Sequence, residues 1–203
     1  CYFCRRGDGL LCETFTQLGI HTNGGFAEYV KAPGENCYVI PDSVDDWAAA
    51  FIEPLTAVIH AAQRMDAPIG ASVAVIGSGL GVLHGALAKA RAAAPVIVIG
   101  TNPARLEIAK KMGADFIIDS NKTPDTVAEV LRLTGGVGVD CVIESVGSVR
   151  TYEQAFKMLR RGGKLEAFGI VPQGQTAALE PYEFVLGEKK VSGSCAGIGN
   201  NWG

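Results

Sequence analysis

The sequence lacks several features that would place it in other classes of protein. No apolar run approaches the roughly 20 residues needed to cross a membrane, and no charged-then-apolar segment resembles a secretory signal. No stripe of basic residues is present, and the formal net charge is −3. We therefore expect a cytoplasmic chain whose partners are neither nucleic acids nor membranes.

Cysteine is present but not in a pattern typical of disulfide-rich domains. A chain without a secretory signal that carries 6 cysteines is not expected to rest on disulfides. Cys37, Cys141 and Cys195 stand alone in apolar surroundings, which predicts inert core positions. The start at Cys1 and the stop after the glycine-rich residues 197–203 indicate a piece of a longer protein.

From residue 72 onwards, short apolar runs alternate with helical patterns. The predicted strands cover residues 72–76, 96–99, 116–118, 141–143, 165–168 and 191–195, and the predicted helices include residues 83–92, 123–133, 151–159 and 181–186. Asn102 and Pro103 predict the cap and first residue of a further helix that ends at Gly113. This alternation predicts an α/β fold, a doubly wound parallel sheet of the Rossmann type.

The first part of the chain differs from this pattern. It holds a cysteine cluster, an aromatic stretch at residues 26–30 and two prolines, but no helical period. We interpret residues 1–52 as the end of an irregular, β-rich domain and residues 53–203 as the dinucleotide-binding domain.

A glycine-rich turn follows the first strand of the predicted sheet. Gly77, Ser78, Gly79, Leu80 and Gly81 lie between that strand and a helix. Glycines there allow the backbone to approach a pyrophosphate, and the helix N-terminus supplies N–H groups. Because Val82 stands where the third glycine of G-x-G-x-x-G is expected, either the loop is one residue shorter or Val82 replaces that glycine. A plain tight turn is the alternative to a coenzyme site.

The end of the second predicted strand bears on the choice of coenzyme. In NAD-binding folds an acidic residue there accepts a hydrogen bond from the ribose 2′-hydroxyl. Gly100 occupies that place, and Thr101, Asn102 and Arg105 follow it. The missing carboxylate favours NADP over NAD. Asn102 is also expected to cap the following helix, and this role alone would explain an asparagine at that position.

Two groups of residues are candidates for metal binding. Cys1, Cys4 and Cys12 supply three of the four ligands that a structural zinc needs, and three free thiols are the alternative. Glu53, before Pro54, is expected at the mouth of a helix, where its carboxylate either serves a metal or caps the helix dipole. His60 lies too far along that helix to share a metal with Glu53. We expect His60 and His84 to be packing residues.

These residues together resemble the zinc-containing medium-chain dehydrogenases, especially the sorbitol, threonine and butanediol dehydrogenase branches. The resemblance covers essentially the whole chain. It includes the cysteine cluster, the GGFAEY stretch at residues 24–29, the EPL segment at residues 53–55 and the RLEIAKKMGAD segment at residues 105–115. It implies that the β-rich part belongs to a GroES-like catalytic domain.

The resemblance also implies roles for individual residues. Cys1, Cys4 and Cys12 would be ligands of a structural zinc, and Glu53 would serve a catalytic zinc directly or through water. Residues on the adenosine-ribose and nicotinamide sides of the coenzyme would be Ser145, Val146, Gly147, Gly169, Ile170 and Val171. An acidic residue at position 53 favours polyol-type substrates.

The function expected from this resemblance is hydride transfer between a secondary alcohol or polyol and NAD(P). A homodimer or homotetramer is expected, joined partly through the last strand, at residues 191–196. Two alternatives stay open: a zinc-free member of the quinone reductase branch, and a non-catalytic nucleotide-binding module.

Overall fold

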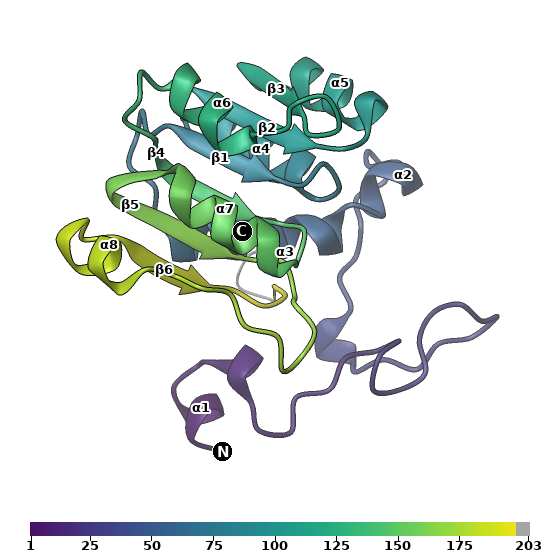
Figure 1. Ribbon diagram of the computed structural model, residues 1–203. Helices are drawn as coiled ribbons and strands as arrows, with labels where there is room; N and C mark the ends of the chain where they lie inside the picture. The colour runs from purple at the N-terminus through teal and green to yellow at the C-terminus, as the bar shows by residue number, and fades with distance from the viewer. Residues whose placement is uncertain (198–203) are drawn as a thin grey trace. The chain divides into compact units, whose positions relative to one another are not determined.

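The computed structural model describes residues 1–197 (Figure 1). These residues divide into two compact units, one formed by Cys1–Thr56 with the segment from Ala196, the other by Ala57–Cys195. The boundary falls inside helix α3 (Ile52–Met65). Most of the glycine-rich stretch expected at residues 197–203 lies outside the described residues.

The second unit contains a parallel sheet of six strands. Its strands are β1 (Val73–Ile76), β2 (Val96–Gly100), β3 (Phe116–Asp119), β4 (Val139–Glu144), β5 (Leu159–Ala167) and β6 (Lys190–Gly193). They are arranged in the order β3-β2-β1-β4-β5-β6, and every pair is parallel. This order confirms the predicted doubly wound fold and places the point where the winding reverses between β1 and β4.

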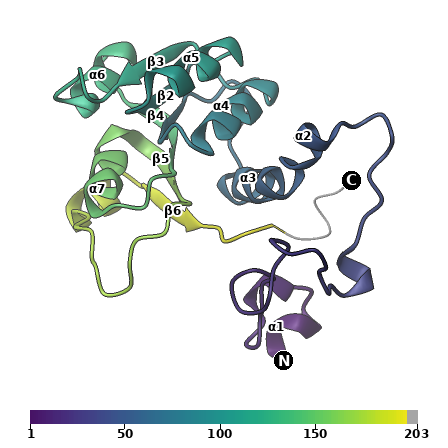
Figure 2. The same cartoon turned by 90° about the vertical axis from the view of Figure 1, so that its right-hand side faces the viewer.

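Helices cover both faces of the sheet, which explains why its central strands are apolar throughout (Figure 2). Val73 and Val75 pack with residues of α3, α4 (Gly81–Ala90) and α5 (Pro103–Lys111). Ala74 and Ile76 pack on the other face with α6 (Thr126–Leu133) and α7 (Val149–Met158). A short helix, α8 (Pro181–Leu186), lies between β5 and β6 in the chain.

Side chains cap three of these helices at their N-termini. Asn102 accepts from the Arg105 N–H at 3.2 Å, and Asp125 and Ser148 cap α6 and α7 in the same way. Helix α4, which follows the glycine-rich turn, begins without such a side-chain bond. Its first N–H groups are therefore not satisfied by a capping side chain.

Several predicted element boundaries are shifted by one residue or more, and three of these shifts have a clear physical reason. Helix α3 begins at Ile52, so Glu53 is already helical. Pro54 therefore lies in the first turn of the helix, where a backbone N–H would have no intrahelical partner and proline is tolerated. Helix α6 begins at Thr126, because Asp125 is its cap. Strand β5 begins at Leu159, six residues before the predicted start, because its basic, glycine-containing first half hides the apolar pattern.

The first unit is irregular, as expected, but its described residues contain no strand. They form helices α1 (Tyr2–Arg5) and α2 (Asp46–Ala49), the 3₁₀ helices η1 (Gly9–Leu11) and η2 (Gly34–Asn36), and one isolated bridge between Leu18 and Thr22. Phe26 and Tyr29 are exposed and pair with no neighbouring strand of the described chain. A β pattern in sequence becomes a strand only where a neighbour completes the hydrogen bonds.

Two of the three isolated cysteines differ from expectation. Cys141, on the central strand β4, is buried, and burial raises its pKa to about 11, as for an inert core thiol. Cys37 and Cys195 are exposed. Their apolar sequence neighbours therefore did not predict a core position.

Candidate functional site

The carboxyl ends of β1 and β4 meet at the point where the winding of the sheet reverses. Gly77 follows β1 with a φ of +118°, a conformation that glycine adopts readily. A Cβ atom on Gly77 would lie 3.0 Å from the Ser145 oxygen and 3.1 Å from Val146 Cγ2. Glycine is therefore required here by the backbone conformation and by the close approach of the loop after β4.

A pocket of about 440 Å³ opens at this edge of the sheet. It collects residues from the ends of β1, β2, β3 and β4 and from the start of α7. The predicted coenzyme residues that line it are Gly77, Ser78, Gly79, Gly100, Thr101, Asn102, Arg105, Ser145 and Val146. The structure thus brings together nine of the residues that the sequence proposed.

The pocket is suited to an anion. None of the described residues that line it is acidic, and two of them, Arg105 and Arg150, carry positive charge. Hydroxyl and amide side chains supply hydrogen-bond donors beside these guanidinium groups, and charge-assisted bonds to phosphate are the strong ones among protein hydrogen bonds. The lining therefore fits a phosphate-bearing ligand.

Several pocket residues were missed by the sequence analysis. They are Ser120, Asn121, Thr126, Ser148, Arg150, Thr151 and Gln154. Ser120 and Asn121 follow the third strand at the same sheet edge, so the rule that ligands bind beyond the carboxyl ends of strands could have found them. Arg150 and Gln154 lie on α7 and gave no comparable signal.

Six predicted coenzyme residues do not line this pocket: Leu80, Gly81, Gly147, Gly169, Ile170 and Val171. Gly81 instead starts α4, where a Cβ atom would lie 3.1 Å from Val75 Cγ1, and a Cβ atom on Gly85 would lie 2.9 Å from Val98 Cγ2. Val82 is buried in the core. Gly81 and Gly85 thus bring α4 close to the sheet, which is the task expected of the third motif glycine.

Gly100 and Ser78 are in close contact across the ends of β2 and β1. A Cβ atom on Gly100 would lie 2.5 Å from Ser78 Cβ and closer still to Ser78 Oγ. Real Cβ atoms do not approach other heavy atoms this closely. A side chain at position 100 would therefore require Ser78 to move.

A buried carboxylate organises the loop that follows β4. Glu144 is fully buried and accepts hydrogen bonds from the backbone N–H groups of Val146 and Gly147 at 3.0 and 3.1 Å. A Cβ atom on Gly169 would collide with Gly147, and one on Gly147 would lie 2.5 Å from the Ile170 oxygen. The loops after β4 and β5 therefore touch through backbone, next to the pocket.

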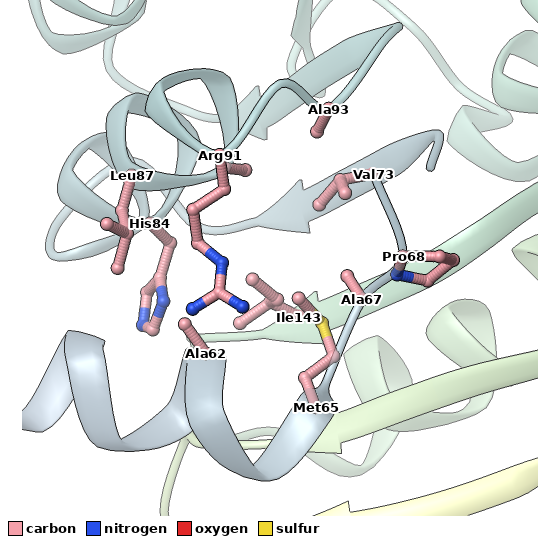
Figure 3. Close-up of a pocket in the computed structure, with 11 residues that line it drawn as sticks. Ala62, Met65, Ala67, Pro68, Val73, His84, Leu87, Arg91, Ala93 and Ile143 are labelled. Carbon is pink, nitrogen blue, oxygen red and sulfur yellow. The ribbon is translucent and has the colours of Figure 1, made fainter. Parts of the chain in front are cut away.

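A second, smaller space lies between α3 and α4 and is far too small for a nucleotide (Figure 3). Its volume is about 20 Å³, and Ala62, Met65, Ile143 and the ring of His84 are among its lining residues. His84 is 1% exposed, and neither ring nitrogen has a hydrogen-bond partner in the described chain. It packs edge-on against Phe168, with ring centroids 4.5 Å apart, which confirms its predicted packing role.

The cysteine cluster of the first unit has a geometry that suits zinc. The thiol sulfurs of Cys1, Cys4 and Cys12 all lie within 4.8 Å of one another, and those of Cys1 and Cys4 are 3.6 Å apart. Tetrahedral Zn–S bonds of about 2.3 Å place sulfurs about 3.8 Å apart. The Thr14 hydroxyl, 3.5 Å from Cys12 Sγ, is the main cause that lowers the pKa of Cys12, whereas the hydrogen bond with Cys12 is the main cause that raises the pKa of Cys4.

Glu53 does not belong to a comparable cluster. Among the described residues, the three cysteines form the one group of three or more potential ligands. Glu53 is exposed in the first turn of α3, and its backbone oxygen accepts from the Thr56 hydroxyl at 2.7 Å. His60 lies almost two helical turns beyond Glu53 in α3. It is partly buried, and burial is the main cause that lowers its pKa.

Fold and pocket together define a dinucleotide-binding domain of the doubly wound class, and residues 79–202 match the family of zinc-binding dehydrogenases. The chain belongs to this family. No helix in the described part of the chain is long and apolar enough to cross a membrane.

Curated relatives of this chain include threonine dehydrogenases. It is 35% identical over 176 residues to L-threonine 3-dehydrogenase of Sinorhizobium medicae, a match that covers 86% of this chain and 50% of that protein. The corresponding enzyme of Pyrococcus horikoshii is 38% identical over 174 residues, covering 85% of this chain and 49% of that protein. The chain thus spans about half the length of these relatives.

Solved structures share the fold over nearly the whole chain. A protein of Sinorhizobium meliloti 1021, described as a zinc-binding dehydrogenase and bound to NADP, superposes with a TM-score of 0.92 at 32% identity, over 99% of this chain and 59% of that one. The alcohol dehydrogenase of Aeropyrum pernix superposes with a TM-score of 0.84 at 28% identity, again over 99% of this chain and 59% of that one.

Proposed function

We propose that this chain forms the coenzyme-binding part of a zinc-dependent oxidoreductase that transfers hydride between a secondary alcohol or polyol and NADP(H). The observation that carries the proposal is the pocket at the β1–β4 switch point, lined by two arginines and by no acidic residue of the described chain. Membership of the zinc-binding dehydrogenase family supports the reaction class.

The choice of NADP over NAD has three supports. Position 100 at the end of β2 has no carboxylate to repel a 2′-phosphate. Arg105, Thr101 and Asn102 line the pocket beside it. The S. meliloti structure, which shares 32% identity, was solved with NADP, whereas an alcohol dehydrogenase of E. coli that shares 26% identity was solved with NADH, so it is the neighbour of higher identity that favours NADP.

The two zinc sites are proposed from the membership of the zinc-binding dehydrogenase family. Cys1, Cys4 and Cys12 would hold a structural zinc, and Glu53 would serve the catalytic zinc directly or through its water. A bound zinc ion supplies Lewis acidity that lowers the pKa of the substrate hydroxyl, while the coenzyme supplies the hydride acceptor.

The chain's own residues have distinct tasks in this account. The turn at Gly77 and the uncapped start of α4 bind the pyrophosphate. Arg105 pairs with the 2′-phosphate. Glu144 fixes the loop at Ser145, Val146 and Gly147, and Gly169, Ile170 and Val171 line the nicotinamide side. We also propose a cytoplasmic location and self-association through β6.

The proposal is tested on the intact protein with a panel of secondary alcohols, including sorbitol, butane-2,3-diol and L-threonine, each with NADP and with NAD. We expect zinc-dependent formation of reduced coenzyme, lost on chelation and restored by zinc. Glu53→Ala should reduce turnover while leaving NADP affinity unchanged. Coenzyme binding without turnover of any alcohol, with zinc fully loaded, would favour the non-catalytic module.

A further inference from the structure

We propose that a cavity between α7 and α8 binds a small zwitterion that carries one carboxylate and one ammonium group, as an α-amino acid does. The cavity has a volume of about 560 Å³ and shares no lining residue with the coenzyme pocket. Its walls come from α7, from residues 178–180, from α8 and from Lys189, which directly precedes β6. A volume of this order is typical of small-molecule sites.

Lys189 is the buried charge of this cavity. It is 8% exposed, and its ammonium group lies 4.6 Å from the centre of the Phe156 ring and donates to the Phe156 backbone oxygen at 3.3 Å. Glu183 Oε2 forms an ion pair with it at 3.7 Å, which is longer than an ordinary hydrogen bond. Because an ammonium group has three N–H donors, Lys189 is able to donate to a further anionic group inside the cavity.

The same cavity is lined by three carboxylates, those of Glu153, Glu180 and Glu183. Glu153 accepts a hydrogen bond from the backbone N–H of Ala178 at 3.1 Å. Glu180 and Glu183 are exposed, and the Glu180 side chain does not cap α8, although it stands in the capping position. The cavity therefore has negative groups at its exposed side and a buried ammonium group in its wall.

This arrangement of charges selects the class of ligand. A ligand with negative charge alone would meet three carboxylates, and a ligand with positive charge alone would be repelled by Lys189. A ligand carboxylate that accepts from Lys189 would replace Glu183 as its partner. The Glu183 side chain is 48% exposed, so it can turn to accept from the ligand ammonium instead. Both ends of a zwitterion would then make charge-assisted hydrogen bonds.

The apolar part of the wall indicates what lies between the two charges. Phe156 is 4% exposed and stacks on Phe184, with ring centroids 5.6 Å apart and an angle of 14° between the rings. Leu179 and Ala178 line the cavity beside Phe156. We therefore expect an amino acid with a short aliphatic side chain.

The experiment uses L-norvaline, which has an aliphatic side chain and no hydroxyl group to oxidise. Calorimetry on the intact protein compares its Kd with those of pentanoate and n-butylamine, which lack the ammonium and the carboxylate respectively. We expect norvaline to bind at least about tenfold tighter than either compound. None of the three is a secondary alcohol or a coenzyme, so the result does not depend on the proposed function.

Two variants test the two ends of the ligand. Lys189→Met keeps an apolar stem against Phe156 and removes the charge, so it should weaken norvaline at least about tenfold. Glu180→Gln should weaken norvaline several-fold and leave pentanoate unchanged. Lys111→Gln and Glu107→Gln, at exposed positions on α5, are the matched controls and should change neither affinity.

Thermal unfolding shows whether each variant is folded. If Lys189→Met does not fold, Glu180→Gln decides, because it changes an exposed side chain. Absence of norvaline binding to the unaltered protein would overturn the proposal. Norvaline binding with the same Kd in folded Lys189→Met or in Glu180→Gln would overturn it as well, because the amino acid would then bind elsewhere on the protein.

Discussion

The phenol of Tyr152 on α7 donates a hydrogen bond to the backbone oxygen of Gly169, 2.5 Å away, just beyond the end of β5. Burial, followed by the nearby charges of Glu144 and Glu166, raises the pKa of Tyr152 to about 12, so the phenol keeps its proton. This bond and the Glu144 carboxylate together hold the loops after β4 and β5, and we place the second of these loops on the nicotinamide side.

Replacing Tyr152 with phenylalanine should therefore loosen the nicotinamide side alone. We expect a loss of stability of about 1 kcal/mol for the missing hydrogen bond. NADP should bind several-fold more weakly, whereas 2′,5′-ADP, which lacks nicotinamide, should bind as before. Tyr182→Phe, at an exposed position on α8, is the matched control and should change neither. Equal weakening of both ligands by Tyr152→Phe would contradict the placement of Gly169.

The cysteine cluster gives a second prediction. Cys4→Ser removes one soft ligand of the proposed structural zinc, so the intact protein should lose about one zinc per chain and unfold at a lower temperature. Metal analysis by mass spectrometry and thermal unfolding measure both effects. Cys37→Ser, an exposed cysteine outside the cluster, should retain all zinc. Unchanged zinc content in Cys4→Ser would refute the assignment.

His84 should make stability depend on pH. Burial lowers the pKa of His84 from 6.5 to about 4, so the folded state holds the ring neutral. Because the unfolded chain takes up a proton first, stability is complete above about pH 6.5 and is lost as the pH falls towards 4. The loss amounts to about 3 kcal/mol.

Replacing His84 with leucine should remove this dependence and raise stability at neutral pH, because two buried nitrogens without partners disappear. Urea unfolding between pH 4 and pH 7 measures the free energy of unfolding and its dependence on pH. The pKa of His60 is also lowered, mainly by burial and then by Arg64, and Glu166 opposes this, so His60 acts in the same window. The difference between wild type and variant isolates His84, and parallel pH curves would contradict its assignment.

The outer edge of β6 is the proposed site of self-association. Val191 is 42% exposed on this strand, which pairs with β5 and with no further strand among the described residues. Val191→Lys should weaken edge-to-edge pairing and shift the protein towards monomer in analytical ultracentrifugation. Val137→Lys, exposed before β4, is the control. Identical sedimentation of the Val191 variant and the wild type would contradict assembly through β6.

The sequence predicted the sheet well, because strands buried on both faces are continuous apolar runs and each glycine or cap marks an end. Strand β5 was recognised only in its second half, because Arg160, Arg161 and two glycines interrupt the apolar pattern while the backbone still pairs with β4. Helix α3 was placed too late, because proline is tolerated in a first helical turn.

The sequence predicted the coenzyme-site residues that come directly after a strand. It did not predict contacts between residues that are far apart in the chain. The turn at Gly77 and the residues after β2 follow from their positions after strands. The contact between Ser78 and Gly100 joins residues 22 positions apart and becomes visible only once β1 and β2 pair. Arg150 faces the pocket from α7, and its sequence neighbours contain no phosphate-binding pattern.

The affinity of the intact protein for NADPH and for NADH, determined by calorimetry under identical salt conditions, tests directly whether the pocket beyond β1 and β2 reads a 2′-phosphate. We expect NADPH to bind at least about tenfold tighter than NADH, a difference of roughly 1.4 kcal/mol. Tighter binding of NADH by the same factor would show that the ribose is read elsewhere and would contradict the account.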